Sequence, residues 1–359
     1  MNAGIYIHVP FCAKKCPYCD FYSVQYRADA AERYADAVIR NIAALPADIH
    51  ADSVYFGGGT PSLLPEMHIQ RIIDAIYARC EMAPDTEITL EANPLTLTDK
   101  KLRAWRECGI NRLSVGVQSF QADVLAGLGR KHSPQQAADA VKRAADIGYV
   151  NLSIDLMTGL SMQTEQSVAE DLRMAAELPV THISSYMLKI EEGTPFAEHP
   201  PDCLSEDDLA ARYLQIHNAL TAAGFRHYEI SNFAKPGFES RHNCKYWRLA
   251  PYYGIGPAAH SCYGGVRYAV SRDLAAFCDA PVQIQTVTEP HAESESERIM
   301  LGLRMAEGIR LDSVPESRSR LMRRAKPLIP QYLESDGETL RMTPQGWLVS
   351  NAVLVQLGI

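Results

Sequence analysis

The sequence predicts an α/β fold: a partial (β/α)6 barrel of parallel strands, followed by a small, mainly helical C-terminal domain. Two observations predict it. Short apolar runs rich in β-branched residues alternate with longer stretches in which apolar residues recur every three or four positions. The chain, with 359 residues, is also long enough for one large α/β barrel with an appended domain.

The predicted strands and helices alternate along the first half of the chain. The strands are residues 5–9, 53–56, 87–91, 112–117, 151–156 and 182–187. The helices between them are residues 30–45, 65–79, 99–108, 134–147 and 164–178, and Gly109 and Gly148 follow two of them as C-terminal breakers. This order is typical of parallel βα units, in which functional residues gather at the carboxyl ends of the strands.

The alternation stops after residue 187. Residues 190–245 contain four prolines around one predicted helix at 207–223, and residues 246–272 are rich in aromatic residues and glycine. A charged helical segment begins near Ser294, and residues 339–347 indicate a short strand pair before a last helix. We therefore predict a barrel over residues 1–230, an extension over 231–285 and a winged-helix-like domain over 286–359.

The composition narrows the classes of protein to which the chain can belong. Its 35 Lys and Arg residues stand against 43 Asp and Glu residues, a formal net charge of −8, so a broad basic surface for nucleic acid is not expected. No apolar run approaches the roughly 20 residues that span a bilayer. Residues 1–6 contain neither a basic leader nor the apolar core of a signal peptide. We expect a cytoplasmic protein.

Three of the nine cysteines form a motif directly after the first predicted strand. Cys12, Cys16 and Cys19 have the spacing C-x3-C-x2-C, so their thiolates can surround one metal centre and leave one position open. Structural zinc normally takes four ligands. A cubane iron–sulfur cluster held by three cysteines instead exposes its fourth iron. The spacing favours the iron–sulfur cluster, with a zinc site and three unconnected thiols as the alternatives.

Glycine and polar residues mark the ends of the later predicted strands. Gly57, Gly58 and Gly59 follow the second strand, where the lack of Cβ atoms lets a ligand approach the backbone, although a tight turn is an equal explanation. No Lys-Ser or Lys-Thr follows them, which excludes a phosphate-binding loop. Further along, the strand ends carry Glu91, Gln118, Arg130 and Asp155. Each alone is typical of a solvated loop, but together they indicate a ligand site.

The cysteine motif, with Tyr18 before its last cysteine, resembles the cluster motif of the radical S-adenosylmethionine (SAM) superfamily. The resemblance implies that Cys12, Cys16 and Cys19 hold a [4Fe-4S] cluster, whose fourth iron is chelated by the amino and carboxyl groups of SAM. It implies a radical SAM barrel as the fold. The SAM contacts that it implies are Tyr6, Tyr18, Gly58, Gly59, Thr60, Glu91, Gln118, Arg130 and Asp155.

Longer segments resemble the oxygen-independent coproporphyrinogen III oxidase group of that superfamily. They are residues 6–12, 19–21, 56–62, 114–120, 155–160 and 340–351, and so extend through the whole chain. The group contains porphyrinogen oxidases and the HemW-type haem chaperones. The oxidases have a fourth cysteine two residues after the last cluster cysteine, where this chain has Phe21, and an N-terminal extension before the motif. Both differences favour the chaperones.

A third feature is the run Arg-His-Asn-Cys-Lys-Tyr-Trp at residues 241–247, which resembles the H-N-x-x-Y-W signature of the haem chaperones. The resemblance implies that His242 is a haem ligand. Imidazole is a common axial ligand of haem iron, and Tyr246 and Trp247 offer flat apolar faces to a porphyrin. The alternative is an exposed loop histidine beside two packing aromatic residues.

The function that the resemblance implies is that of a haem chaperone, which binds haem and transfers it to acceptor haemoproteins, including membrane-bound respiratory ones. The [4Fe-4S] cluster and SAM would then regulate or trigger the transfer. The alternative is an oxidase that uses a 5′-deoxyadenosyl radical to decarboxylate coproporphyrinogen III. Self-association into a homodimer is left open, and contact with a membrane is expected to be peripheral at most.

Overall fold

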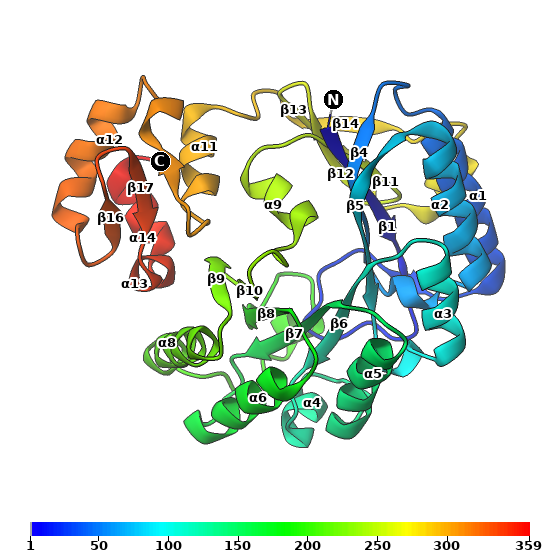
Figure 1. The fold of residues 1–359 in the computed structure, drawn as a ribbon, viewed down its shortest axis with the longest axis horizontal. Coiled ribbons are helices and arrows are strands. Elements are labelled where there is room, and N and C mark those ends of the chain that lie inside the picture. The colour runs from blue at the N-terminus through cyan, green and yellow to red at the C-terminus, as the bar shows by residue number, and fades with distance from the viewer. Residues whose placement is uncertain (1) are drawn as a thin grey trace.

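The computed structural model describes residues 2–359 and contains a 12-stranded sheet that curves into an open barrel (Figure 1). Six strands in the middle of this sheet are parallel to one another. They are β1 (Asn2–Val9), β4 (His50–Gly58), β5 (Glu81–Ala92), β6 (Arg112–Gln118), β7 (Asn151–Thr158) and β8 (His182–Met187). Each predicted strand lies within one of them, so the predicted fold class is confirmed.

Helices cover the outer face of these strands, as Figure 1 shows for α1 to α6. The predicted helices correspond to α1 (Ala28–Ala43), α2 (Glu66–Arg79), α3 (Asp99–Glu107), α5 (Pro134–Asp146), α6 (Glu165–Glu177) and α8 (Glu206–Ala222). Side-chain caps explain several of their starts: Ser133 and Gln136 form a capping box at α5, and Thr98 caps α3. The short helices α4 (Ala122–Gly127) and α7 (Pro195–Glu198) were not predicted.

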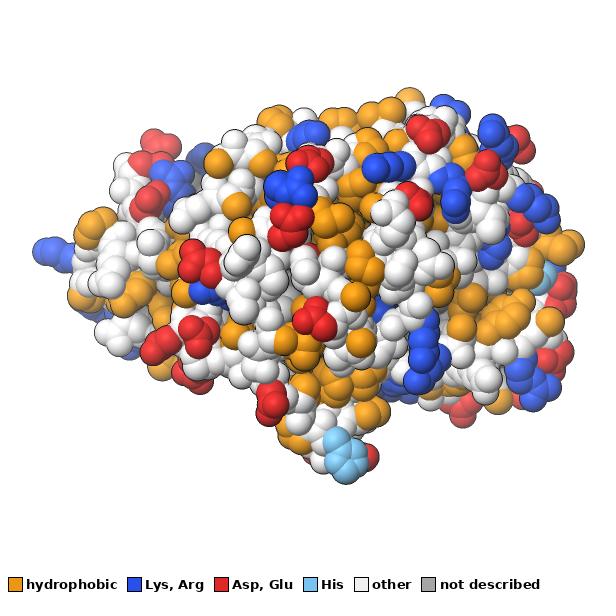
Figure 2. Space-filling view, turned by 90° about the horizontal axis from the view of Figure 1, so that it is seen from below, with side chains coloured by type: hydrophobic (Ala, Val, Ile, Leu, Met, Phe, Trp, Pro, Cys, Tyr) orange, Lys and Arg blue, Asp and Glu red, His pale blue; other side chains and the backbone are white. Residues whose placement is uncertain are grey.

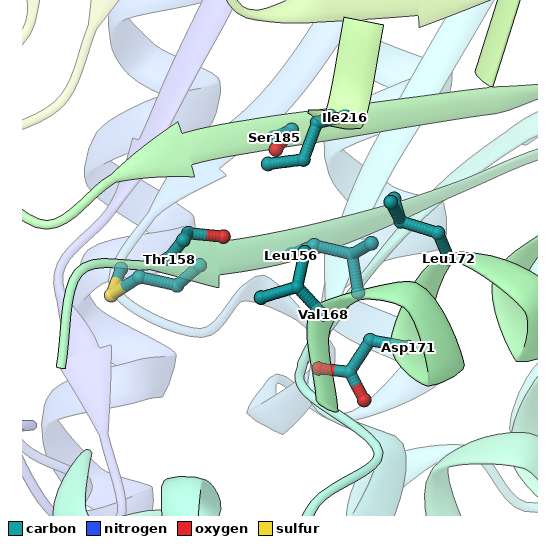
Figure 3. Close-up of a pocket in the computed structure, with 8 residues that line it drawn as sticks. Leu156, Thr158, Val168, Asp171, Leu172, Ser185 and Ile216 are labelled. Carbon is teal, nitrogen blue, oxygen red and sulfur yellow. The ribbon is translucent and has the colours of Figure 1, made fainter. Parts of the chain in front are cut away.

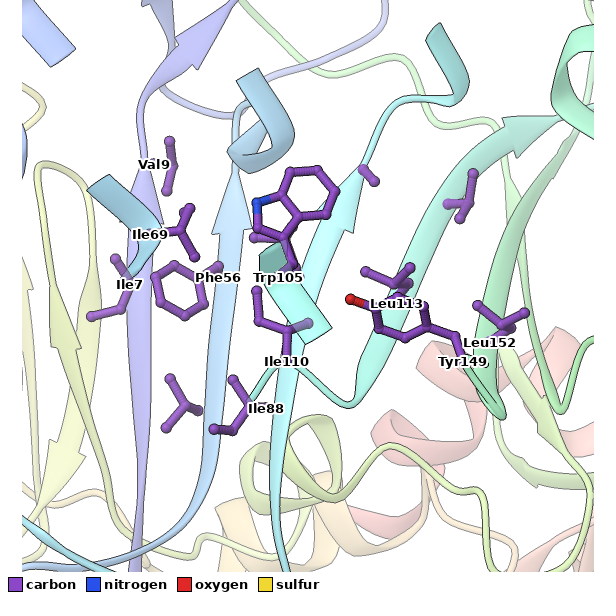
Figure 4. Packing of buried hydrophobic residues seen from close by; sticks show 14 of the residues in the cluster. Ile7, Val9, Phe56, Ile69, Ile88, Trp105, Ile110, Leu113, Tyr149 and Leu152 are labelled. Carbon is purple, nitrogen blue, oxygen red and sulfur yellow. The ribbon is translucent and has the colours of Figure 1, made fainter. Parts of the chain in front are cut away.

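The two faces of the parallel strands differ in character, because successive residues point to opposite sides of a sheet. Outward residues such as Ile7 and Phe56 are apolar, fully buried and packed near Ile69 of α2 and Trp105 of α3 (Figure 4). Burial of each such side chain stabilises the fold by about 1.5–3 kcal/mol. The residues that alternate with them and face the barrel interior are mostly polar. They include Tyr6, His8, Ser53, Tyr55, Glu87, Glu91, Arg112, Ser114, Asp155 and Ser184.

Further strands extend the sheet at both edges of the six parallel strands, which the sequence did not predict. Next to β1 lies β11 (Tyr252–Ile255), parallel to it, followed by the antiparallel strands β12 (His260–Tyr263), β13 (Val266–Val270) and β14 (Gln285–Glu289). Next to β8 lie β10 (Asn232–Ala234) and β9 (Arg226–Glu229). The predicted division at residue 285 falls inside β14. The division into 1–230, 231–285 and 286–359 otherwise stays a prediction.

Smaller elements complete the barrel part. β2 (Phe11–Cys12) and β3 (Val24–Gln25) pair in parallel beside the cysteine motif. Helix α9 (Arg241–Trp247) connects β10 to β11, and α10 (Leu274–Asp279) connects β13 to β14. In Figure 1, α9 lies on the inner side of the curved sheet, opposite the covering helices. Single 3-10 turns occupy Pro61–Leu63, Pro94–Thr96, Leu311–Ser313 and Lys326–Leu328.

The C-terminal part has its own apolar core and a three-stranded sheet. Its elements are α11 (Glu295–Gly302), β15 (Ile309–Arg310), α12 (Arg318–Ala325), β16 (Leu333–Ser335), β17 (Thr339–Met342), α13 (Pro344–Leu348) and α14 (Ser350–Leu357). Two backbone hydrogen bonds join it to the barrel, from Ile230 N to Arg304 O at 3.0 Å and from Ala306 N to Tyr228 O at 2.9 Å. The edge strand β9 is therefore covered by the C-terminal part.

The surface agrees with the acidic composition. On the face shown in Figure 2, Lys and Arg side chains are interspersed with Asp and Glu side chains instead of forming one continuous basic field. Within residues 2–359, every helix is too short or too polar to cross a bilayer.

Candidate functional site

The three cysteines of the C-x3-C-x2-C motif lie in the loop that follows β1. All three are free thiols of intermediate exposure. Backbone hydrogen bonds tie both ends of the loop together, from Val24 N to Pro10 O at 2.7 Å and from Tyr26 N to Cys12 O at 3.0 Å. The loop is thus fixed at the carboxyl end of the barrel by its own main chain.

The surroundings of the cysteines are those of potential thiolate ligands. Arg130 donates from one guanidinium nitrogen to Cys16 Sγ at 3.3 Å and from another to Gly116 O at 2.7 Å. Cys12 Sγ hydrogen-bonds with Thr60 Oγ1 at 3.5 Å. Burial raises the pKa of the Cys19 thiol, and the neighbouring Cys16 and Cys12 raise it further. The fixed positive charge of Arg130 therefore offsets part of the cost of several thiolates in one place.

The spacing of the thiols in space bears on the zinc alternative. Among residues 2–359, no three His, Cys, Asp or Glu side chains are close enough together to hold a single metal ion. A cubane cluster needs cysteine sulfurs that are farther apart than a single ion does, because each sulfur binds a different iron. The choice between a cluster and mononuclear zinc therefore stays a prediction.

The glycine-rich segment after β4 lies directly against the cysteine loop. Gly59 N donates to Val9 O at 2.8 Å, and Thr60 N donates to Phe11 O at 2.7 Å. A Cβ atom at Gly59 would lie 2.7 Å from Phe11 O, closer than real Cβ atoms approach backbone oxygen. Gly58 has a φ of +107°, which favours glycine, and a Cβ there would overlap the His8 ring. These glycines are required by the close approach of two backbone segments.

Glu91 links this glycine segment to the interior of the barrel. Its carboxylate accepts a hydrogen bond from Tyr55 Oη at 2.8 Å and another from Gly58 N at 3.2 Å. Burial raises the pKa of Glu91 to about 7, the hydrogen bond from Tyr55 opposes the shift, and the charge of Asp155 adds to it. Burial likewise raises the pKa of Tyr6, with a smaller contribution from the charge of Glu91.

Asp155 and Tyr18 occupy other parts of the same end of the barrel. Asp155 accepts from Ser114 Oγ at 3.4 Å, and burial raises its pKa, opposed mainly by a hydrogen bond from Ser184. Burial also raises the pKa of Tyr18, and the charge of Arg130 opposes the rise. Tyr18 packs against Phe196 with ring centroids 6.3 Å apart.

Gln118 adopts a strained backbone conformation at the end of β6, with a φ of +71°. The next residues are held by Asp171 of α6, which accepts from Ser119 Oγ at 2.6 Å, Phe120 N at 2.9 Å and Gln121 Nε2 at 3.1 Å. The sequence did not single out Asp171. An aspartate in a predicted helix is common, and it lies about 50 residues from the loop that it holds, so nothing in the sequence marks it as a support of that loop.

The structure thus brings the predicted SAM contacts to one end of the barrel. Tyr6 stacks on Tyr55, Tyr55 and Gly58 both donate to Glu91, and Thr60 and Arg130 contact Cys12 and Cys16 of the motif. A Cβ atom at Gly116 would lie 2.9 Å from an Arg130 nitrogen and 3.0 Å from Gln118 Nε2, so these two side chains converge on one point. What each residue binds stays a prediction.

His242 lies in a different place from the loop that the sequence suggested. It is in helix α9, it is fully buried, and it packs against the inner face of β1 and β4. Its ring stacks on Tyr55, with centroids 5.3 Å apart and an angle of 27° between the planes. Both ring nitrogens are hydrogen-bonded, Nδ1 to Ser53 Oγ and Nε2 to Tyr246 Oη, each at 3.0 Å. The alternative interpretation, an exposed loop histidine, is therefore wrong, and the role of His242 as a haem ligand stays a prediction.

Helix α9 is fixed to the barrel near the amino ends of the strands. The Glu87 carboxylate accepts from the backbone nitrogens of Arg241 at 3.3 Å and His242 at 3.2 Å, which satisfies two amides at the start of the helix. Arg241 pairs with Asp85 and Lys245 pairs with Asp52, each at 2.8 Å. Burial, with the charges of Lys245 and Arg112, lowers the pKa of His242 to about 3, so its ring is neutral at neutral pH.

One pocket lies away from these residues. It is formed between the sheet and the helices α6 and α8, on the outer side of the barrel (Figure 3). Its walls are mainly apolar, from Leu156, Met157, Val168, Leu172 and Ile216, with Thr158, Asp171 and Ser185. It contains none of the predicted site residues, and we interpret it as a gap in packing.

Comparisons with known proteins are consistent with this geometry. The family model of the radical SAM superfamily matches residues 6–175, and that of the HemN C-terminal domain matches residues 290–349. A protein named heme chaperone HemW from Escherichia coli (strain K12) is 41% identical over 261 residues, 72% of this chain and 69% of the relative. Its namesake from Lactococcus lactis is 33% identical over 361 residues, 97% of this chain and 95% of the relative.

A solved structure shows the same fold over nearly the whole chain. The coproporphyrinogen III oxidase HemN from Escherichia coli superimposes with a TM-score of 0.83 over 99% of this chain and 89% of that chain. The two sequences are 22% identical, so this likeness concerns the fold alone. From the family models and the long HemW matches together, the chain belongs to the radical SAM superfamily and, within it, to the HemW family.

Proposed function

We propose that the protein is a haem chaperone, which binds haem through His242, carries a [4Fe-4S] cluster and SAM, and transfers the haem to acceptor haemoproteins. The observation that supports this function most is helix α9. It presents the H-N-x-x-Y-W residues on the inner face of the barrel, in a chain whose relatives are named heme chaperones.

The residues at the carboxyl end fit the cluster. Cys12, Cys16 and Cys19 supply three soft thiolate ligands, and Arg130 beside Cys16 supplies a compensating positive charge. The cluster, when bound, supplies one-electron chemistry and an iron with an open coordination position for the methionine part of SAM.

The residues around the cysteines also fit SAM. Glu91 has a carboxylate suited to ribose hydroxyls, and it is held in place by Tyr55 and by the backbone of Gly58. The backbone of Gly58 and Gly59 would meet the amino group. Tyr6, Tyr18, Thr60, Gln118, Arg130 and Asp155 complete the proposed set of SAM contacts. Two of the proposed contacts, Glu91 and Asp155, are acidic, which suits a ligand that carries a sulfonium cation.

The side chain of His242 is chemically suited to bind haem iron, but in its present position the ring is not accessible to haem. A neutral imidazole is the form that binds iron, and the low pKa of His242, about 3, keeps it neutral. Its Nε2, however, is bonded to Tyr246, and its ring is enclosed by Tyr55 and Ser53. Haem binding through His242 therefore requires α9 to move from its place on β1 and β4.

Acceptor haemoproteins, including membrane-bound respiratory ones, are the proposed partners, and the proposed location is the cytoplasm with peripheral membrane contact at most. Helix α12 offers a surface for such contacts. Arg318, Arg320, Arg323 and Arg324 are exposed on it, and within residues 2–359 none of them pairs with a carboxylate. A homodimer remains open to measurement.

The alternative function, an oxygen-independent coproporphyrinogen III oxidase, would use the same cluster and SAM residues. Those residues therefore do not distinguish the two functions. Phe21, which is 59% exposed, occupies the position of the additional cysteine of the oxidases. Anaerobic incubation of the reduced, cluster-loaded protein with SAM and coproporphyrinogen III separates the functions, because a vinyl product at sustained turnover would support the oxidase.

The test of the proposed function is a haem titration of the cluster-loaded protein, with the Soret band as readout. His242→Ala is the variant. His182→Ala is a matched control, because His182 is also buried, with Nδ1 on Ser153 Oγ at 2.7 Å and Nε2 on Tyr228 Oη at 2.8 Å.

We expect parental haem binding in the control and binding weakened by about tenfold or more in His242→Ala, with a changed spectrum. Equal haem binding by His242→Ala and the parent would refute the assignment of His242. A parent without any specific haem complex would refute the chaperone function itself.

A further inference from the structure

Helix α9 is held from two sides, and the second side belongs to the C-terminal part of the chain. The barrel holds the start of the helix through Glu87, Asp85 and Asp52. The end of the helix instead contacts residues 304–307, the segment between α11 and β15. Residues 304–307 are neither predicted cluster nor predicted SAM residues, and they contact Trp247, the last residue of the H-N-x-x-Y-W motif.

Three contacts join residues 304–307 to the end of α9. The guanidinium of Arg304 lies over the Trp247 ring, with Cζ 4.3 Å from the ring centroid. Arg248 forms a two-point ion pair with Glu307, at 2.9 and 3.1 Å. Met305 packs with Cys244 in a small apolar cluster. The Arg248–Glu307 pair is about half exposed on both sides and so contributes little. The Arg304–Trp247 contact is the stronger restraint.

Arg304 has a second partner that it does not use in this arrangement. Glu229 of β9 is 1% exposed, and its Oε2 has no hydrogen-bond partner among the described residues. Arg304 Nε is also buried without a partner there. The charge of Arg304 acts on Glu229 and opposes the rise of its pKa that burial causes. Within residues 2–359 no ion pair joins the two side chains.

One atom of each group, Glu229 Oε2 and Arg304 Nε, is thus left without a partner at a cost, although Glu229 Oε1 accepts from Ser231 N at 3.1 Å and from Asn232 Nδ2. If Trp247 leaves with α9, the guanidinium can turn to Glu229, and both groups then gain a partner. The contact with Trp247 stabilises α9 on the barrel, whereas the pairing with Glu229 offsets part of the cost of moving α9 away.

We infer that Arg304 is a positioning residue for His242: it holds α9 on the barrel through Trp247, and it exchanges Trp247 for Glu229 when α9 moves to let His242 bind haem. The inference rests on the proposed function for the role of His242, and it assigns to the C-terminal part the control of haem access.

Two readouts test this inference on the cluster-loaded protein. The first is the rate of haem capture in stopped-flow experiments, followed at the Soret band. The second is hydrogen–deuterium exchange of residues 241–248 without haem, which reports the position of α9 whether or not haem binds. The variants are Arg304→Gln, Arg304→Lys and Glu229→Gln, with Trp247→Phe as a second way to weaken the same contact.

Lys235→Gln is the matched control. Lys235 lies over the Phe225 ring at 5.4 Å, a cation–aromatic contact near the same edge of the sheet that involves no residue of α9. It should leave capture and exchange at parental values.

We expect Arg304→Gln to speed haem capture by about twofold to thirtyfold, the range that loss of one cation–aromatic contact allows, and to raise exchange in α9. Arg304→Lys keeps the charge and should stay near the parent. Glu229→Gln removes the second partner and should slow capture, an effect opposite in sign that a purely structural role of Arg304 would not produce.

The inference would be overturned if both Arg304→Gln and Trp247→Phe showed the parent's rate of haem capture and the parent's hydrogen–deuterium exchange in α9. Faster haem capture without increased exchange in α9 would also overturn it. Haem capture that does not depend on His242 would refute the assignment of His242 instead, and a parent without any specific haem complex would refute the proposed function. In either case the exchange of α9 in the haem-free variants would still decide whether Arg304 positions the helix.

Discussion

The two ends of the barrel interior are built in opposite ways. At the carboxyl end, backbone segments and glycines form the site, as where Gly59 lies against the main chain of Val9 and Phe11. At the amino end, the side chains of α9 fill the interior, and His242 is enclosed with both nitrogens bonded. Under the proposed function, the first end is preformed for its ligand, whereas the second must open before it can bind haem.

A single strand connects the two ends. On β4, Ser53 bonds to His242, Tyr55 stacks on His242 and donates to Glu91, and Gly58 donates to the same Glu91 carboxylate. The comparison therefore shows that both sites use strand β4. They differ in what packs against it, which is the cysteine loop at the carboxyl end and helix α9 at the amino end. Variants at one end of the barrel interior should therefore leave ligand binding at the other end unchanged, apart from effects that pass through Tyr55.

The largest effect is expected from Gly59→Ala, which breaks the preformed end. The new Cβ would meet Phe11 O and Val9 O, so the glycine segment must move off the cysteine loop at a cost of about 3 kcal/mol. We expect anaerobic reconstitution to yield little iron and sulfide and no SAM binding.

The control for Gly59→Ala is Gly224→Ala. Gly224, unlike Gly59, has a positive φ, and open space surrounds its Cβ position, so only about 1 kcal/mol of backbone strain is expected. Full cluster content in Gly59→Ala would contradict the proposed site.

Glu91→Gln tests the carboxyl end of the barrel through the pH dependence of the free energy of unfolding and of SAM affinity. The pKa of Glu91 is raised to about 7 in the folded protein from 4.5, so the folded state binds the proton more tightly than the unfolded state. The free energy of unfolding of the cluster-free parent should therefore fall as the pH rises from about 4.5 to about 7, by about 3 kcal/mol from this residue.

The Gln variant should lack that decline, which denaturant titrations at several pH values measure. SAM affinity should rise through about pH 7 in the parent, because the carboxylate form accepts from ribose hydroxyls, and should stay flat in Glu91→Gln. Identical pH profiles of the two proteins would count against a raised pKa at Glu91.

Gly4→Ala tests the amino end of the barrel, where α9 packs on β1. A Cβ at Gly4 would lie 2.9 Å from His242 Cε1 and 3.0 Å from Lys245 Cδ, so it pushes α9 off β1. We expect a loss of about 1–3 kcal/mol in the free energy of unfolding, together with faster haem capture and unchanged cluster content. Slower haem capture in a folded Gly4→Ala protein would show that α9 must stay on β1 to bind haem.

The smallest effect is expected from Asp171→Ala. It removes the acceptor of Ser119 Oγ and Phe120 N, so the loop after the strained Gln118 loses its support at about 1–3 kcal/mol. SAM affinity should fall by about threefold to tenfold in calorimetric titrations, whereas exchange in α9 should not change. Asp139→Ala, an exposed aspartate of α5 bonded only to Gln135, is the control.

The features that the sequence predicted correctly are local ones. The strands of the barrel follow from short apolar runs, and the cysteine loop lies at the carboxyl end of β1 because its motif directly follows the first of these runs. The polar residues at the strand ends could also be placed, because the carboxyl ends of parallel strands lie together.

The features that the sequence did not predict depend on contacts between distant residues. His242 meets Ser53, 189 residues away, and its helix begins on Glu87, 155 residues away. No periodicity near residue 242 carries that information. Ser53, Tyr55 and Glu87 alternate with apolar neighbours along their strands, but this pattern does not reveal the helix that covers part of the inner face.

The central claim is that His242 is closed in the resting protein and becomes a haem ligand only when α9 moves. Hydrogen–deuterium exchange of residues 241–248 in the cluster-loaded parent, with and without saturating haem, tests it most directly. We predict slow exchange without haem and exchange faster by about tenfold or more with haem, as the amides lose Glu87. Unchanged protection of α9 in a complex whose Soret band depends on His242 would contradict the claim.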